Sequence, residues 1–398
     1  MDSRGAFGQN ATMKSRLSSA LANLALVLAS LAVTYLAASF LILRFVYPHL
    51  SVNLRPHFPD IAEVFAQTSK AATVPRDPIV LLGDSYAEGQ GDGLFNANGD
   101  RARAQHSAHV LHRLTGRDVI SIGAGGAGSA QAMVRMPARI LRGGCFLYPQ
   151  LAPPRRMLVY FYEGNDLEEN GFVVRSAPAS GGITREAIAR YVRRRYEAPP
   201  PLRCLTDLGE TGFKMAQFIL TNAQSWETLR KPSAHNKVIA GGTAHAAPAL
   251  QKPPLELDPA LLTAALTVFD VSLEWLTRVF ASTDITIVYL PSPAAIYRHA
   301  APSVDAYMRW PLNQVESVAV EAIYAASQRT CEAIRKLALA HRARFLDMRP
   351  ALRAAAATAV LHGPRDWNHF NDAGYRVLGE TLARTLDDAA STGCVDWN

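Results

Sequence analysis

The stretch Ile79-Val80-Leu81-Leu82-Gly83-Asp84-Ser85-Tyr86-Ala87-Glu88-Gly89 decides the fold that the sequence predicts. Its first half is an unbroken apolar run, which is typical of a buried strand in a parallel sheet. Gly83 permits a sharp turn at the carboxyl end of that strand, where open α/β sheets place their reactive groups. We therefore expect a strand over residues 77–85 that presents Ser85 beside the start of a helix. The alternative interpretation of Gly-Asp-Ser is a plain turn in which the serine caps a helix.

The rest of the chain alternates between apolar runs and helical periodicity. This alternation predicts an α/β fold, a doubly wound three-layer α/β/α sandwich with a mostly parallel sheet, over residues 77–398. A segment rich in proline and glycine, residues 167–256, breaks the pattern and is interpreted as an insertion on the active-site side. Further strands are expected at 118–122, 157–162, 285–290 and 344–347, and helices at 101–115, 259–281, 313–341 and 372–390.

The amino-terminal region predicts one transmembrane helix. Residues 17–43 contain no charged side chain, and as a helix they extend roughly 40 Å, more than the ~30 Å hydrocarbon core of a bilayer. The apolar region of a cleaved signal peptide is shorter. Arg4, Lys14 and Arg16 precede the segment, which favours a cytoplasmic tail at 1–16. Residues 44–76 then form a linker and a short helix, and the large domain lies in the periplasm or outside the cell.

The composition and charge restrict the partners. Of 398 residues 49% are hydrophobic and 19% charged, and the net charge is +7. A basic protein favours anionic surroundings such as acidic polysaccharide or phospholipid headgroups. No helix-turn-helix, zinc-finger or RNP pattern accompanies the charge, so nucleic acid is not expected. The basic run at residues 190–195 is interpreted either as a solvated face or as a site for an anionic glycan or headgroup.

Four cysteines suggest disulfides rather than a metal site. Cys145, Cys204, Cys331 and Cys394 include no C-x-x-C pair and have no histidine pair at ligand spacing nearby, so no metal is expected. An even number of cysteines outside the cytosol favours disulfides. Our hypothesis is Cys145–Cys204 and Cys331–Cys394, and free buried thiols are the alternative.

Four short blocks follow one another at predicted strand or loop ends. They are Gly83-Asp84-Ser85, the glycines of residues 123–128, Asn165, and Asp366-Trp367-Asn368-His369. Together they resemble the SGNH (GDSL) hydrolase family, which is built on four such blocks in this order. Tyr86 departs from the family pattern, which has leucine there, and Ser121-Ile122 stands where members often carry an asparagine.

The resemblance implies a role for each matching residue. Ser85 becomes the nucleophile, His369 its base, and Asp366 the carboxylate that orients the imidazole. The physical chemistry agrees, because a serine hydroxyl is a weak nucleophile until an imidazole takes its proton. The oxyanion hole of the family implies the backbone N–H groups of Ser85 and Gly126 and the side-chain amide of Asn165. The assignment of Gly126 depends on its offset from the preceding strand.

The glycines also fit a rival motif. Gly123, Gly125 and Gly128 spell G-x-G-x-x-G after a strand, as in dinucleotide-binding folds. That motif needs an acidic residue about 20 positions further on, and the next one here is Glu163. We therefore expect no cofactor.

The sequence thus predicts a membrane-anchored extracytoplasmic serine esterase that works through an acyl-enzyme. Its expected substrate is an ester-bearing glycan, with O-acetyl groups on envelope polysaccharide preferred. The alternatives are an O-acetyltransferase with the same triad, a lipid esterase, and a catalytically silent binding or assembly protein in polysaccharide export.

Overall fold

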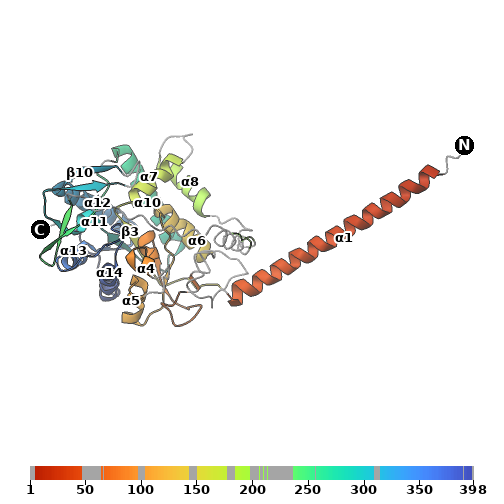
Figure 1. Ribbon diagram of the computed structural model, residues 1–398, viewed down its shortest axis with the longest axis horizontal. Helices are drawn as coiled ribbons and strands as arrows, with labels where there is room; N and C mark the ends of the chain where they lie inside the picture. Colours follow the sequence, from red (N-terminus) through yellow and green to blue (C-terminus); the bar gives the residue numbers. More distant parts are fainter. Residues whose placement is uncertain are drawn as a thin grey trace.

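The computed structural model has a long amino-terminal helix and an α/β domain (Figure 1). It describes residues 5–46, 64–65, 67–96, 104–142, 150–176, 184–197, 236–255, 257–308, 314–388 and 390–396, with the single residues 206, 209 and 213. The predicted Cys145–Cys204 pairing lies outside the described residues.

A five-stranded sheet forms the centre of the domain. Its strand order is β11-β7-β3-β1-β2, and every pairing is parallel. The class is therefore mixed α/β with a parallel central sheet, as the sequence predicts. The strands are β1 (Ile79–Leu82), β2 (Val119–Ser121), β3 (Arg156–Tyr162), β7 (Asp284–Leu290) and β11 (Arg344–Asp347).

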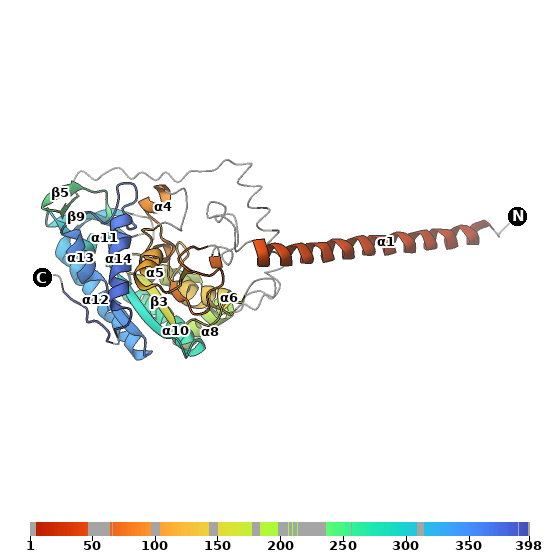
Figure 2. The same cartoon turned by 90° about the horizontal axis from the view of Figure 1, so that it is seen from below.

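Helices cover both faces of this sheet (Figure 2). Alternate residues of β1 belong to different cores, since Val80 and Leu82 join one apolar cluster whereas Ile79 and Leu81 join the other. The first cluster is formed with η4 (Gln131–Arg135), α6 (Met136–Ile140), α8 (Arg185–Val192) and α10 (Pro259–Val279). The second is formed with α5 (Ser107–Thr115), α11 (Pro293–Ile296), α13 (Arg349–Ala356) and α14 (Asp372–Thr385).

Two small sheets lie outside the central one. The first contains β4 (Lys237–Ala240), β5 (Thr243–Ala246) and β8 (Arg298–His299), and the second contains β6 (Leu250–Gln251), β9 (Ser303–Tyr307) and β10 (Val315–Ala319). The expected start of a helix at residue 313 is therefore wrong. Residues 315–319 alternate in exposure as a strand does, and α12 runs only from Val320 to Ala340.

Other predicted bounds also shift. The first strand ends at Leu82, and Ser85 is the first residue of the short helix α3 (Ser85–Glu88). The expected helix at 101–115 begins only at Ser107, where the His106 side chain caps it. The segment at 167–256, interpreted as an insertion, contains most of α7 (Asp166–Ser176), all of α8, the π-helical turn η5 (Arg193–Glu197) and the short strands β4, β5 and β6. α7 packs closely on α10.

The amino-terminal helix extends away from the domain (Figures 1 and 2). α1 (Gly5–Leu41) continues into the π-helical turn η1 (Ile42–Val46). An 18-residue window within residues 18–46 has a mean hydropathy of 2.3 and is almost entirely exposed, so this segment is a candidate membrane span. α10 is also long and apolar enough, but it is half buried within the domain.

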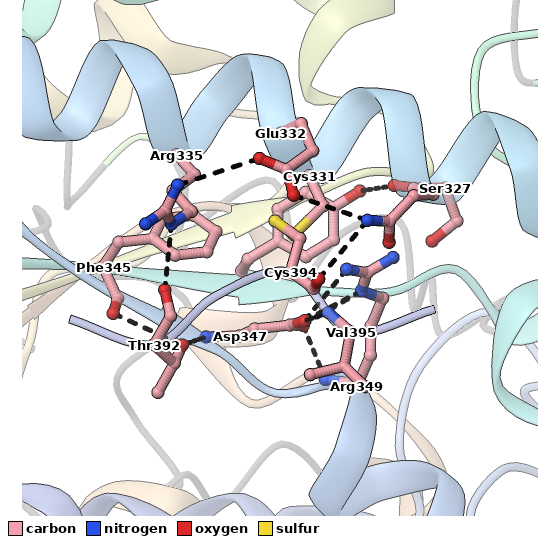
Figure 3. Close-up of a disulfide and its surroundings, with 12 residues drawn as sticks. Ser327, Cys331, Glu332, Arg335, Phe345, Asp347, Arg349, Thr392, Cys394 and Val395 are labelled. Carbon is pink, nitrogen blue, oxygen red and sulfur yellow. Dashed lines mark hydrogen bonds and ion pairs between the residues drawn. A yellow bond between two sulfur atoms is a disulfide. The ribbon is translucent and has the colours of Figure 1, made fainter. Parts of the chain in front are cut away.

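A disulfide joins the carboxyl-terminal tail to α12 (Figure 3). It links Cys331 to Cys394, which confirms this predicted pair. The tail then runs beside β11, the edge strand of the sheet: the Thr392 N–H donates to the Phe345 carbonyl oxygen at 2.9 Å. The disulfide thus holds in place a segment that covers an otherwise open sheet edge.

Candidate active site

The turn between β1 and α3 places Ser85 at the carboxyl end of the sheet. Gly83 has a positive φ of 152°, and a Cβ there would lie 2.9 Å from the Cβ of Tyr160. The Asp84 carboxylate caps α3 by accepting a hydrogen bond from the Tyr86 N–H at 3.0 Å. These constraints start the helix at Ser85 and fix the direction of its side chain.

The structure brings Ser85, His369 and Asp366 together in one chain of hydrogen bonds. His369 Nε2 lies 2.9 Å from Ser85 Oγ, and His369 Nδ1 lies 2.6 Å from Asp366 Oδ2. The other Asp366 carboxylate oxygen accepts the Asn368 N–H at 2.8 Å. Residues 284 positions apart in the sequence thus meet in the order hydroxyl, imidazole, carboxylate.

The charges in this chain favour a protonated imidazole. Burial lowers the pKa of His369, but the charge and hydrogen bond of Asp366, together with the charges of Asp84 and Glu88, outweigh it, so the net pKa is raised. Burial raises the pKa of Asp366, but the charge and hydrogen bond of His369 and nearby backbone N–H groups lower it by more. The net pKa of Asp366 is therefore lowered. An imidazole stabilised in this way can take a proton from the serine hydroxyl.

The glycine-rich loop after β2 packs directly on the helix that carries Ser85. A Cβ at Gly123 would lie 2.3 Å from the backbone nitrogen of Glu88, so only glycine permits this approach. Gly126 follows with a positive φ of 69°. In the part of the chain that the structure describes, the backbone N–H groups of Ser85 and Gly126 donate to no other protein group.

Asn165 lies between β3 and α7 and is almost fully buried. Burial raises the pKa of the Asp84 carboxyl group, next to Ser85, and the nearby Asn165 side chain opposes that rise. Among the described residues the Asn165 Oδ1 atom has no partner. The structure therefore places Asn165 beside the turn that carries Ser85.

Asp84 and Asp166 support the turns beside Ser85 and Asn165. Asp166 Oδ2 accepts the Tyr162 N–H at 3.1 Å, which closes the turn around Asn165. Burial raises the pKa of Asp166 well above its ordinary value, and the Asp84 charge raises it further. Burial also raises the pKa of Asp84.

Three further side chains, for which the sequence motifs give no role, hold the loop of Asp366 and His369. The Asp92 carboxylate, at the start of α4 (Asp92–Asn96), accepts the backbone N–H groups of Arg365 at 3.0 Å and of Asp366 at 2.6 Å. Backbone anchoring of this kind fixes where the Asp366 carboxylate can point.

Tyr86 and Tyr307 hold the same loop one residue before the histidine. The Tyr86 hydroxyl donates to the Asn368 carbonyl oxygen at 2.6 Å, and the Tyr307 hydroxyl donates to the Asn368 side chain. The ring of Tyr86 is fully buried, with its centroid 5.4 Å from that of His369. The only sequence signal for these contacts was the tyrosine at a position where the family pattern has leucine.

Comparisons with known proteins add a weak structural likeness. No protein-family model matches the sequence, and no curated protein matches it. Among solved structures, an extracellular lipase from Streptomyces rimosus is 13% identical, with a TM-score of 0.38, over 79% of this chain and 100% of its own. A phospholipase A1 from Streptomyces albidoflavus NA297 is 12% identical, with the same TM-score and coverage. The function of this chain therefore has to be inferred from the geometry of its own site.

Proposed function

We propose that the chain is a serine esterase of the SGNH type that works through an acyl-enzyme. The observation that carries this proposal is the continuous chain from Ser85 Oγ through His369 to Asp366, with contacts of 2.9 and 2.6 Å. A side-chain network that only stabilised the fold would not need a hydroxyl, an imidazole and a carboxylate in this order.

The reaction follows from these positions. Ser85 Oγ attacks the ester carbonyl carbon while its proton passes to His369 Nε2, and Asp366 stabilises the imidazolium that forms. The tetrahedral oxyanion is bound by the N–H groups of Ser85 and Gly126 and by the Asn165 amide. His369 then protonates the departing alcohol, and the acyl group stays on Ser85. Water, deprotonated by His369, attacks this acyl-enzyme and releases the acid.

The proposed location is a membrane surface outside the cytoplasm. α1 serves as a single-pass anchor with a cytoplasmic amino terminus, and Arg4, Lys14 and Arg16 before the span support that orientation. An esterase held there meets envelope material, and its proposed substrates are O-acetyl groups on an envelope polysaccharide. The disulfide Cys331–Cys394 is consistent with an oxidising compartment.

The test is acyl release by the full chain in detergent. p-Nitrophenyl acetate, an O-acetylated polysaccharide and a phospholipid are compared, with Ser85→Ala as the control. The proposal expects acetate from the first two, and loss of both activities in the variant. Release of fatty acid alone would mean that the substrate is a lipid ester and not a glycan ester. Transfer of acetate to an added glycan would mean that the protein is a transferase. A folded protein inactive on all three would favour the binding-protein alternative.

A further inference from the structure

One surface of the domain carries positive charge that the proposed reaction does not use. We call it the basic face and define it as the exposed side chains of Arg190, Arg193, Arg194 and Arg195 on α8 and η5. Within the described part of the chain, none of these four arginines forms an ion pair. The only acidic residues on the same two elements are Glu186 and Glu197. The basic face therefore has a surplus of unneutralised charge.

The packing of α8 explains why these arginines point outward. Ile188 and Val192 are buried in the core cluster that α10 also lines. Arg190, Arg193 and Arg194 are spaced three and four residues apart, so they lie on one side of the helix, away from the buried residues. Arg185, by contrast, is neutralised by Asp270 and Glu274 of α10 at 2.8 and 2.5 Å.

The basic face lies on the side of the domain from which the amino-terminal helix extends. Both views place α6 and α8 on the side of the domain that faces the carboxyl-terminal end of α1 (Figures 1 and 2). Phe40 and Ile42, at that end, pack on the same core cluster as Ile188 and Val192. Arg44 is exposed at the same end of the helix. If α1 spans a bilayer, the basic face is close to the bilayer surface.

Half-buried aromatic side chains accompany the arginines. Tyr191 and Tyr196 lie with ring centroids 6.5 Å apart, and the Arg195 guanidinium lies 6.0 Å over the Tyr196 ring. Tyrosines with an apolar body and a polar tip are favoured at the headgroup level of membranes. Guanidinium groups donate paired hydrogen bonds that match the oxygens of a phosphate.

We propose that the basic face docks on the anionic phospholipid headgroups of the bilayer that α1 spans. The proposal depends on the membrane anchoring proposed above. Each arginine near an anionic leaflet strengthens docking by a factor of roughly five, so three of them together contribute roughly 100-fold. Docking would fix the rotation of the domain about α1 and hold it against the membrane.

Hydrogen–deuterium exchange of the full chain in lipid nanodiscs tests this proposal. One set of nanodiscs contains phosphatidylcholine alone, and the other has a third of the lipid replaced by phosphatidylglycerol. The amides of residues 185–197 are expected to exchange several-fold more slowly in the anionic discs. High salt should remove the difference, because it screens charges beyond a few ångströms. The variant R190Q/R193Q/R194Q should lose the slowing even at low salt.

The matched control removes three exposed arginines on β8, α12 and α14. R298Q/R329Q/R376Q makes the same change in net charge, and it should keep the slowing by phosphatidylglycerol. Equal exchange in both lipids would overturn the docking proposal. Slowing by soluble polygalacturonate but not by phosphatidylglycerol would also overturn it and would assign the face to an acidic glycan. A chain that does not enter nanodiscs at all would contradict the anchoring itself.

Discussion

The Tyr86 hydroxyl donates a hydrogen bond of 2.6 Å to the backbone carbonyl oxygen of Asn368, the residue before His369. The residue that follows the proposed nucleophile thus holds the loop that carries the proposed base. The two lie 282 positions apart in the sequence. Ser85 and His369 are therefore positioned by a direct contact between their own neighbours.

Tyr86→Phe should lower kcat roughly tenfold and leave KM unchanged, because the Asn368 carbonyl oxygen loses its donor and the His369 loop loosens. The measurement is steady-state turnover of p-nitrophenyl acetate. Tyr160→Phe is the matched control, since it removes a buried hydroxyl whose one partner among the described residues is the Ser107 hydroxyl, at 3.1 Å. Equal loss of kcat in the two variants would mean that Tyr86 acts only on stability.

The pH dependence of kcat/KM should follow the titration of His369. A general base works only when deprotonated, so activity is lost as the pH falls through the His369 pKa, which Asp366 holds above the ordinary value of 6.5. Asp366→Asn leaves the burial that lowers this pKa and removes the charge that raises it. The acidic limb should then move to lower pH, and kcat should fall by about 10⁴-fold. An acidic limb that stays at the same pH would mean that Asp366 does not raise the pKa of His369.

Asn165→Ala should lower kcat by roughly 100- to 1,000-fold, the usual effect of removing one oxyanion donor. The measurement is again ester turnover at saturating substrate. Asn170→Ala is the matched control, because that buried amide bonds Ser129 and the Ala265 carbonyl oxygen instead. It should lower stability and leave kcat within a few-fold. Unchanged turnover in Asn165→Ala would remove this residue from the site.

Replacing both Cys331 and Cys394 with alanine should lower the free energy of unfolding by about 4 kcal/mol, because the disulfide closes a long loop in the unfolded chain. The two cysteines are 63 positions apart. Urea unfolding followed by circular dichroism measures the change. An unchanged unfolding midpoint would mean that the hydrogen bonds of the tail to β11 suffice to hold it.

Much of the fold could be predicted because apolar runs mark the central strands. β1, β3 and β7 are buried on both faces, so their sequences are nearly continuous hydrophobic stretches. β6 and β8 have only two residues each and carry no such signal. Ser85 was expected at a strand end, but the Asp84 carboxylate caps the chain there and begins a helix.

In the candidate site, too, some residues could be predicted from the sequence and others could not. Ser85, Asn165, Asp366 and His369 follow from short blocks at strand and loop ends, and the structure places them around one turn. Asp92 and Tyr307 could not be predicted, because each acts on the Asp366–His369 loop from more than 60 positions away. A single sequence contains no local pattern for such a contact.

Fluorophosphonate labelling of the full chain in detergent, followed by peptide mapping, tests directly whether His369 activates Ser85. Fluorophosphonates react with a serine hydroxyl that a neighbouring base has activated. We expect a single label on Ser85, with none in Ser85→Ala and little in His369→Ala. A folded protein that remains unlabelled, or is labelled equally in His369→Ala, would contradict the proposal that Ser85 and His369 work as nucleophile and base.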